Sequence, residues 1–178
     1  KILQAVSEMQ ENELLDAIEE AVRLSILEER PSAGQIRYRF THAFFRRTLY
    51  DEMIAPKRSS LHQRIARILE SLYTLRPEEH AAELAEHFSQ STDPADLSKA
   101  MKYGELAAQQ AAEIYAFSES ARLLNRVLDV QRILEPENKE VRCRLLLQIG
   151  QSLVMAGELH HVLEVEVPAA LSLAESIS

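Results

Sequence analysis

The spacing of apolar and polar positions changes in the first third of the chain. Between residues 36 and 41, aromatic or aliphatic residues alternate with arginines, the period of two that is typical of a half-buried strand. A second strand is predicted at residues 24–28, and residues 30–34 contain the proline and glycine of a turn. After residue 45, apolar positions fall four apart, as on one face of a helix. The pattern predicts one antiparallel hairpin, with Thr41 as the N-cap of the helix that follows.

Most of the remaining chain has the apolar spacing of helices. Residues 12–23 carry an amphipathic stripe, and spacings of three and four resume after Pro56 and after Pro77. Asp93 and Pro94 predict another helix start, because aspartate is a favoured N-cap and proline a favoured first helical residue. Further helices are predicted with breaks near positions 115, 136 and 157. The fold class is therefore predicted to be mainly α.

A degenerate repeat is visible in the last 80 residues. Its clearer copy has a small and a large apolar residue in one helix, a glycine at the turn, and small or apolar residues in the next helix: Gly150, Leu153, Gly157, Val162 and Ala169. A fainter copy, with corresponding positions 42 earlier, comprises Ala108, Ala111, Ser120, Leu124 and Val127. Each helix pair must stack its apolar face on a neighbour, so we expect residues 56–91 to add helices and the protein to continue past Ser178. Pro168 is expected to kink or break the final helix.

Composition narrows the class of protein. Hydrophobic residues make up 46% of the 178 residues and glycine occurs only four times, which favours long helices around a buried core. The single cysteine, Cys143, excludes an internal disulfide and fits a reducing cytoplasm. No apolar run approaches the roughly 20 residues that span a bilayer. The first residues lack both an initiator methionine and the shape of a signal peptide, so we expect a cytoplasmic chain that begins inside a domain.

Charge is distributed unevenly along the chain. The net charge of −8 argues against general nucleic-acid binding. Residues 35–70, however, hold eight basic and three acidic residues, a net charge of +5. This basic face is either a solvated helix surface or a surface that meets an acidic partner, a nucleotide or DNA. Its candidate residues are Arg37, Arg39, Arg46, Arg47 and Arg58.

Glycine positions exclude a phosphate-binding loop in this chain. The loop sequence G-x-x-x-x-G-K-[S/T] needs two glycines five apart, and glycine occurs only at positions 34, 104, 150 and 157. The same positions exclude a dinucleotide loop and a nucleophile elbow. We therefore expect a segment without enzymatic activity of its own.

Potential metal ligands occur on two predicted helices. One helix carries polar residues at helical spacings: His80, Glu83, Glu86 and His87. A metal site usually takes a ligand from a second element, and such spacings are common on acidic helices, so no metal is expected. His160 and His161 would diverge by about 100° on a helix and make a poor pair. Cys143 is expected to be a small buried apolar residue rather than a nucleophile.

The segment around the second strand also resembles a known family. Its residues read Tyr38-Arg39-Phe40-Thr41-His42-Ala43, then Arg46 with Leu49-Tyr50, and then Arg58 with Leu61-His62. They are similar to the end of the winged-helix domain in the large signalling ATPases called STAND proteins. These include bacterial regulators of the maltose-activator type and ATPases fused to nucleotide cyclases or kinases. A weaker, mostly helical similarity covers nearly the whole chain, and Arg47 stands where the family often has an acid.

The resemblance implies two domains and a regulatory function. Residues 1–55 would be the C-terminal part of a winged-helix-like domain, and residues 56–178 a tetratricopeptide-like helical superhelix. The segment would relay nucleotide state and bind a protein partner, its own ATPase domain or a small-molecule inducer. ATP or ADP and Mg would belong to the parent protein, and no cofactor is expected in this chain.

Two further expectations concern His42 and DNA. In the resembling family, a histidine at this junction faces the diphosphate of bound ADP, so His42 is expected to sense nucleotide in the parent protein. The alternative is that His42 caps its own helix. A second candidate function is a DNA-binding winged-helix regulator, which needs a reading helix with base-contacting side chains before the wing. The candidate helix at residues 12–23 is acidic, so nucleic acid is not the expected partner.

Overall fold

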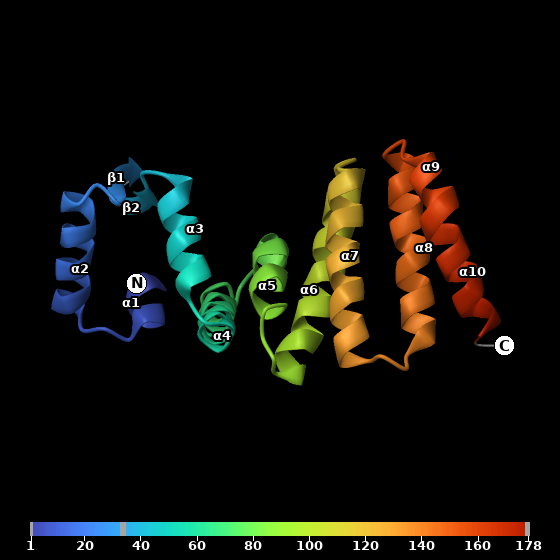
Figure 1. The fold of residues 1–178 in the computed structure, drawn as a ribbon, viewed down its shortest axis with the longest axis horizontal. Coiled ribbons are helices and arrows are strands. Elements are labelled where there is room, and N and C mark those ends of the chain that lie inside the picture. The colour runs from blue at the N-terminus through green and yellow to red at the C-terminus, as the bar shows by residue number, and fades with distance from the viewer. Residues whose placement is uncertain (1, 33–34, 177–178) are drawn as a thin grey trace. The chain divides into compact units, whose positions relative to one another are not determined.

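Helices form most of the chain, and one two-stranded antiparallel sheet lies near its beginning (Figure 1). The structure, a computed structural model, describes residues 2–32 and 35–176. The mainly α fold class with one hairpin is therefore confirmed for these residues. The chain divides into two compact units, Lys1–Ile68 and Leu69–Ser178. This division falls inside helix α4 (Ala55–Leu72), whereas the sequence placed a domain boundary at the start of that helix.

The first unit contains α1 (Ile2–Ser7), α2 (Glu11–Arg23), β1 (Leu27–Ser32), β2 (Gln35–Phe40), α3 (Ala43–Glu52) and most of α4. The predicted stripe on α2 is confirmed, because its apolar residues are half-buried among exposed neighbours. Pro56 lies in the first turn of α4, as predicted, where its missing N–H has no helical partner to lose.

The hairpin is confirmed, but its first strand begins three residues later than predicted. Leu27 pairs with Phe40 and Pro31 with Ile36. The preceding residues instead close the end of α2. The amide of Ile26 donates to the carbonyl of Ala21, and Ser25 takes a left-handed φ of 56°. Such 6→1 closure is the common way to satisfy the last carbonyls of a helix.

The predicted turn was also too wide. Arg30, Pro31 and Ser32 belong to β1 rather than to the turn, and the two remaining turn positions lie outside the described residues. Proline lacks a backbone donor, but a strand in a two-stranded sheet has an open edge where no ladder bond is needed.

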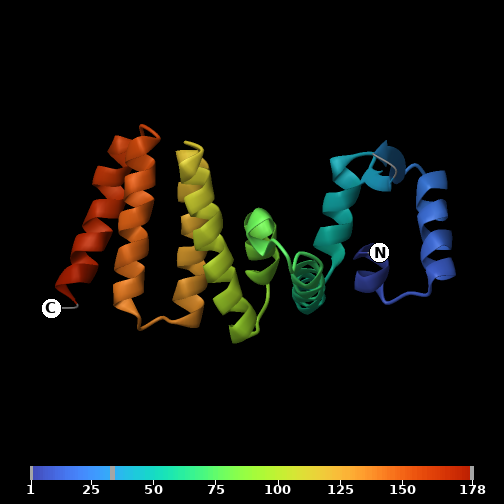
Figure 2. The ribbon, with the colours of Figure 1, turned by 180° about the vertical axis from the view of Figure 1, so that it is seen from behind.

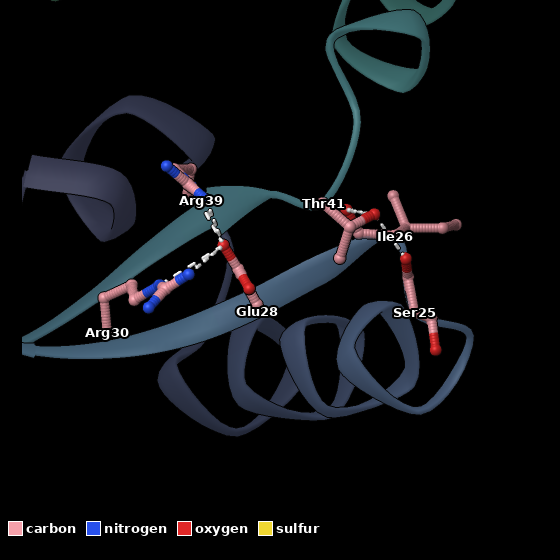
Figure 3. A network of polar contacts seen from close by, with 6 residues as sticks. All are labelled: Ser25, Ile26, Glu28, Arg30, Arg39 and Thr41. Atoms are coloured by element: carbon pink, nitrogen blue, oxygen red, sulfur yellow. Dashed lines mark hydrogen bonds and ion pairs between the residues drawn. The ribbon is translucent and has the colours of Figure 1, made fainter.

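The predicted cap at Thr41 is wrong. The N-cap of α3 is His42, in extended conformation and without a side-chain capping bond. The hydroxyl of Thr41 instead donates to the carbonyl of Ser25 at 2.6 Å, with a longer contact of 3.3 Å to that of Ile26 (Figure 3). Thr41 therefore ties the end of β2 to the end of α2, a contact between distant residues that a local capping pattern does not reveal.

The second unit is a series of helices that pack against their neighbours in chain order. After the 3₁₀ turn Pro77–His80 come α5 (Ala81–Phe88), α6 (Pro94–Glu113), α7 (Phe117–Leu134) and α8 (Lys139–Met155). The last helix runs through α9 (Leu159–His161), a π-helical segment (Val162–Glu166) and α10 (Val167–Glu175). Helices α6, α7, α8 and α10 stand side by side, as seen from opposite directions in Figures 1 and 2. The predicted breaks near positions 115, 136 and 157 are all confirmed.

Predictions from local sequence patterns are also confirmed in this unit. The predicted apolar face of α5 is fully buried, and the side chain of Asp93 accepts a hydrogen bond from the amide of Ala95 at 2.9 Å. Gly157 ends α8 in left-handed conformation, with φ of 86°. The residue 42 positions earlier, Tyr115, ends α6 with φ of 62°. The repeat therefore extends to the backbone at the two turns, although glycine occurs in only one.

One repeat position is wrong. Gly150, Leu153 and Val162 are buried, as are all five residues of the earlier copy, but Ala169 is exposed and Ala170 is buried in its place. The π-helical segment explains the shift, because such a segment widens the helix by about one residue and moves the following positions to a different face. Pro168 lies in the first turn of α10, directly after the π-helical segment, so the helix is not broken there and only its hydrogen-bonding pattern changes.

Within residues 2–32 and 35–176, none of the helices combines the length and the apolar character that crossing a bilayer demands.

Candidate functional site

A cleft in the second unit has a volume of about 570 Å³. Helices α6 and α8 form its two walls, and the first half of α7 forms its floor. The cleft is open to solvent along one side. Its volume lies in the range of small-molecule and peptide sites in proteins.

Each wall follows from helical periodicity. The α6 wall repeats at three and four positions, and so does the α8 wall, so each helix turns one face to the cleft and another to the core. The α6 wall comprises Lys102, Glu105, Leu106, Ala108, Gln109 and Ala112. The α8 wall comprises Gln148, Gln151, Ser152 and Met155. Apolar side chains alternate here with amides, which can donate and accept hydrogen bonds.

The floor joins the two repeat copies. The hydroxyls of Ser120 on α7 and Ser152 on α8 lie 3.2 Å apart, and both side chains are buried. Leu124 continues the floor with an apolar surface. A small hydroxyl pair lets the helices approach closely and keeps the floor deep.

An ion pair links the two helices that form the walls of the cleft. The guanidinium of Arg144 on α8 contacts both carboxylate oxygens of Glu105 on α6, at 2.6 and 3.1 Å. This bonding raises the pKa of Arg144, and the same guanidinium donates to the side chain of Gln148 at 3.2 Å. Bidentate arginine–carboxylate pairs fix geometry as well as charge. The pair thus bridges α6 and α8 beside the cleft.

A second hollow, of about 500 Å³, adjoins the cleft and shares Phe117 and Met155 with it. Tyr115 lines this hollow, with its ring 6.0 Å from that of Phe117 in edge-to-face orientation. The Tyr115 side chain is 82% exposed, although its backbone is left-handed. For a residue other than glycine this conformation costs about 1–2 kcal/mol.

His42 lies exposed at the start of α3 in the first unit. Its ring centroid is 6.1 Å from that of Phe45, at a tilt of 46°. The alternative prediction was that His42 caps its own helix. The structure does not support a side-chain cap, because the imidazole makes no capping hydrogen bond. Although Thr41 is not the cap, the His42 imidazole is exposed and makes no capping bond.

The predicted basic face is partly neutralised. Arg39 pairs with Glu28 at 2.7 Å and Arg30 pairs with the same carboxylate at 3.1 Å (Figure 3). Hydrogen bonding from Arg39, and then from Arg30, lowers the pKa of Glu28. Arg47 lies 3.5 Å from Asp51, one turn along α3. Arg37 and Arg46 are exposed.

The remaining motif residues form a clasp between α3 and α4, which we call the Tyr50 clasp: Tyr50, Arg58 and His62. The guanidinium of Arg58 lies 5.4 Å from the Tyr50 ring centroid and donates to the carbonyl of Met53 at 2.6 Å. The Tyr50 hydroxyl and His62 Nε2 are 3.0 Å apart. Burial lowers the pKa of His62. The spacing that carried the family resemblance therefore also holds two helices together.

The potential metal ligands have other contacts. The ring of His80 stacks on that of Tyr73 at 3.5 Å, and its Nδ1 lies 3.7 Å from Glu83. Glu86 pairs with Arg126 of α7. In the described part of the chain, no group of three or more histidine, cysteine, aspartate or glutamate side chains is placed to hold a metal ion.

The other candidates lie near the end of the chain. His160 lies 3.2 Å from Glu164 one turn later, and the side chain of His161 lies outside the described residues. Cys143 is half-buried rather than buried as expected, and its sulfur lies 3.9 Å from the carbonyl of Ala170.

Comparisons with protein-family models, with curated proteins and with solved structures find no match to this chain.

Sequence reasoning located the helices that build the cleft but not the cleft itself. Its glutamines fall on the face of each helix left over once the buried leucines are assigned to the core, as Gln148 and Gln151 do beside Leu145. This polar face on each helix could have indicated a cleft. The left-handed conformation of Tyr115 was signalled only by its position 42 residues before Gly157.

Proposed function

We propose that this chain is a regulatory and protein-interaction segment of a multidomain signalling ATPase, and that the cleft between α6 and α8 binds an extended segment of a partner protein. The cleft is the observation that carries the proposal. Its α6 wall extends from Lys102 to Ala112, ten helical steps or about 15 Å at the helical rise. An elongated, open hollow of this kind fits a chain better than a compact molecule.

The polar lining supports a peptide occupant. An extended peptide presents a backbone donor and acceptor at every residue, and these groups lose water when they enter a cleft. The amides of Gln109, Gln148 and Gln151 offer both functions on the two walls. The apolar positions between them, including Leu106 and Met155, provide contact area for side chains.

Selection from a library of displayed 12-residue peptides tests the proposal. Wild-type chain should enrich peptides that bind in solution, and Gln151→Trp, which adds bulk to the α8 wall, should weaken them by about tenfold or more. Ala112→Trp adds bulk to the α6 wall and should weaken peptide binding to a similar extent. Ser98→Trp, at an exposed position of α6 that does not line the cleft, is the matched control and should bind as wild type does.

Two outcomes would contradict the proposal. If every enriched peptide binds Gln151→Trp and Ala112→Trp as tightly as wild type, and both variants melt normally, the cleft is not the peptide site. Failure to enrich any peptide also counts against a peptide occupant and favours the small-molecule inducer.

The relay of nucleotide state rests on the family resemblance and on the position of His42. Its exposed imidazole stands at the start of α3, where free backbone N–H groups favour anions. In the parent protein, His42 would donate to a phosphate oxygen of ADP and stabilise the resting state. The tetratricopeptide-like superhelix would then couple partner binding to that state.

A further inference from the structure

Tyr115 combines features that stability alone does not explain. Its backbone is left-handed, which glycine adopts without strain and tyrosine does not. The equivalent turn 42 residues later uses Gly157. The side chain gains little burial in return, because it remains 82% exposed. Strained residues with exposed aromatic side chains are typical of binding positions rather than of cores.

The side chain of Tyr115 lines the hollow that lies next to the cleft. The hollow that Tyr115 lines shares Phe117 and Met155 with the cleft, so the two hollows adjoin. Two aromatic rings in edge-to-face contact and a flexible thioether make an apolar receptor for a large side chain.

The end of the α6 wall that lies farther from Tyr115 is distinguished by its charge. Among the charged side chains of the two hollows, Glu105 is neutralised by Arg144, and Glu119 is neutralised by Arg122 at 2.5 Å. Lys102 is the remaining lining charge, and among the described residues no carboxylate pairs with it. Its ammonium lies 6.0 Å from the centroid of the Tyr103 ring, an arrangement that leaves its hydrogen-bond donors for a ligand.

We infer that the peptide bound in the cleft carries a large apolar or aromatic side chain that packs on Tyr115 and an acidic side chain that pairs with Lys102, about six residues apart. The spacing follows from geometry. Helix α6 rises about 17 Å from Lys102 to its end at Glu113, Tyr115 follows two residues later, and an extended chain covers about 3.3–3.6 Å per residue. This inference rests on the proposed function and specifies the chemistry of its ligand.

The test uses peptides selected on the whole chain and Tyr115 variants. Tyr115→Gly removes the ring and relieves the backbone, so it should weaken the selected peptides about tenfold or more while the melting temperature stays the same or rises. Tyr115→Phe should keep the affinity. Ser25→Gly, which relieves a left-handed residue in the other unit, is the control and should leave binding unchanged.

A double-mutant cycle tests the acidic anchor. Replacing the acid of a selected peptide by its amide should weaken binding to wild type but not to Lys102→Gln. Enriched peptides should show an acidic and a large apolar residue about six positions apart, in either order.

The possible results separate the two proposals. If Gln151→Trp abolishes binding but Tyr115→Gly leaves it unchanged, the cleft binds peptides and this inference is wrong. If neither substitution changes binding, the proposed function fails and this inference fails with it. If Tyr115→Gly lowers the melting temperature, the ring has a structural role; Tyr115→Asn then decides, and unchanged binding by a folded Asn variant overturns the inference.

Discussion

At the scale of single residues, backbone conformation decides which positions tolerate substitution. Gly157 is the clearest case, because its φ of 86° lies in the left-handed region and nothing lies within 4 Å of an added Cβ. A side chain there would meet open space, so any cost of substitution comes from the backbone alone. Tyr115, at the equivalent turn, already has this strained left-handed backbone in the natural sequence.

We predict that Gly157→Val destabilises the second unit by about 1–2 kcal/mol, because a β-branched residue is strained in this conformation. Gly157→Asn should cost less, since asparagine tolerates it. Chemical denaturation of both variants measures the difference. Equal stability of the valine variant and wild type would show that the turn relaxes to another conformation.

His62 gives a prediction for pH. Burial lowers its pKa in the folded state, so folding favours the neutral ring. The contribution is present above the unfolded pKa of about 6.5 and is lost as pH falls through the lower folded value. Thermal stability of the first unit should therefore decrease between pH 7.5 and 5, and the decrease should be smaller in His62→Gln. Identical pH profiles would remove His62 as the cause.

At the scale of elements, close approach of helices sets the spacing of the second unit. A Cβ added to Gly104 on α6 would lie 2.5 Å from a methyl of Val127 on α7, whereas one added to Gly150 on α8 would be 3.6 Å from Val162, an ordinary contact. The two glycines therefore differ in what they permit, although both are buried in helices.

This contrast gives a matched pair of substitutions. Gly104→Ala should destabilise by about 1–3 kcal/mol, because stiff Val127 must shift to make room. Gly150→Ala should be neutral or stabilising by up to about 1 kcal/mol, because alanine is the better helix former. Denaturant midpoints of the two variants provide the measurement. A stable Gly104→Ala variant would mean that α6 and α7 separate easily.

The helices and turns also show which features could be predicted from the sequence and which could not. Helix starts such as Asp93-Pro94 and breaks at Gly157 were predicted correctly because their causes are local. The errors at Thr41 and Ala169 have nonlocal or cumulative causes. Thr41 bonds a residue sixteen positions away, and Ala169 is displaced by a π-helical segment that spacing does not announce. The cleft was missed because it needs two helices and the floor between them.

At the scale of the whole molecule, we propose that the first unit relays nucleotide state and that the second unit binds the partner. We predict that His42→Ala changes the free energy of unfolding of this chain by no more than about 0.5 kcal/mol, because the side chain is exposed and makes no capping bond. In the parent protein the same substitution should speed ADP release, by about tenfold or more for a lost charge-assisted bond. A strongly destabilised chain with unchanged ADP release would assign His42 a structural role instead.

The central claim is that the cleft between α6 and α8 binds a peptide. Backbone amide chemical shifts of labelled chain, titrated with the tightest selected peptide, test it most directly. The account predicts saturable shifts concentrated at cleft residues of α6, α7 and α8, including Gln109, Phe117 and Gln151, with little change in the β1–β2 hairpin. Shifts confined to residues outside the cleft walls and floor, in a titration that reaches saturation, would contradict it.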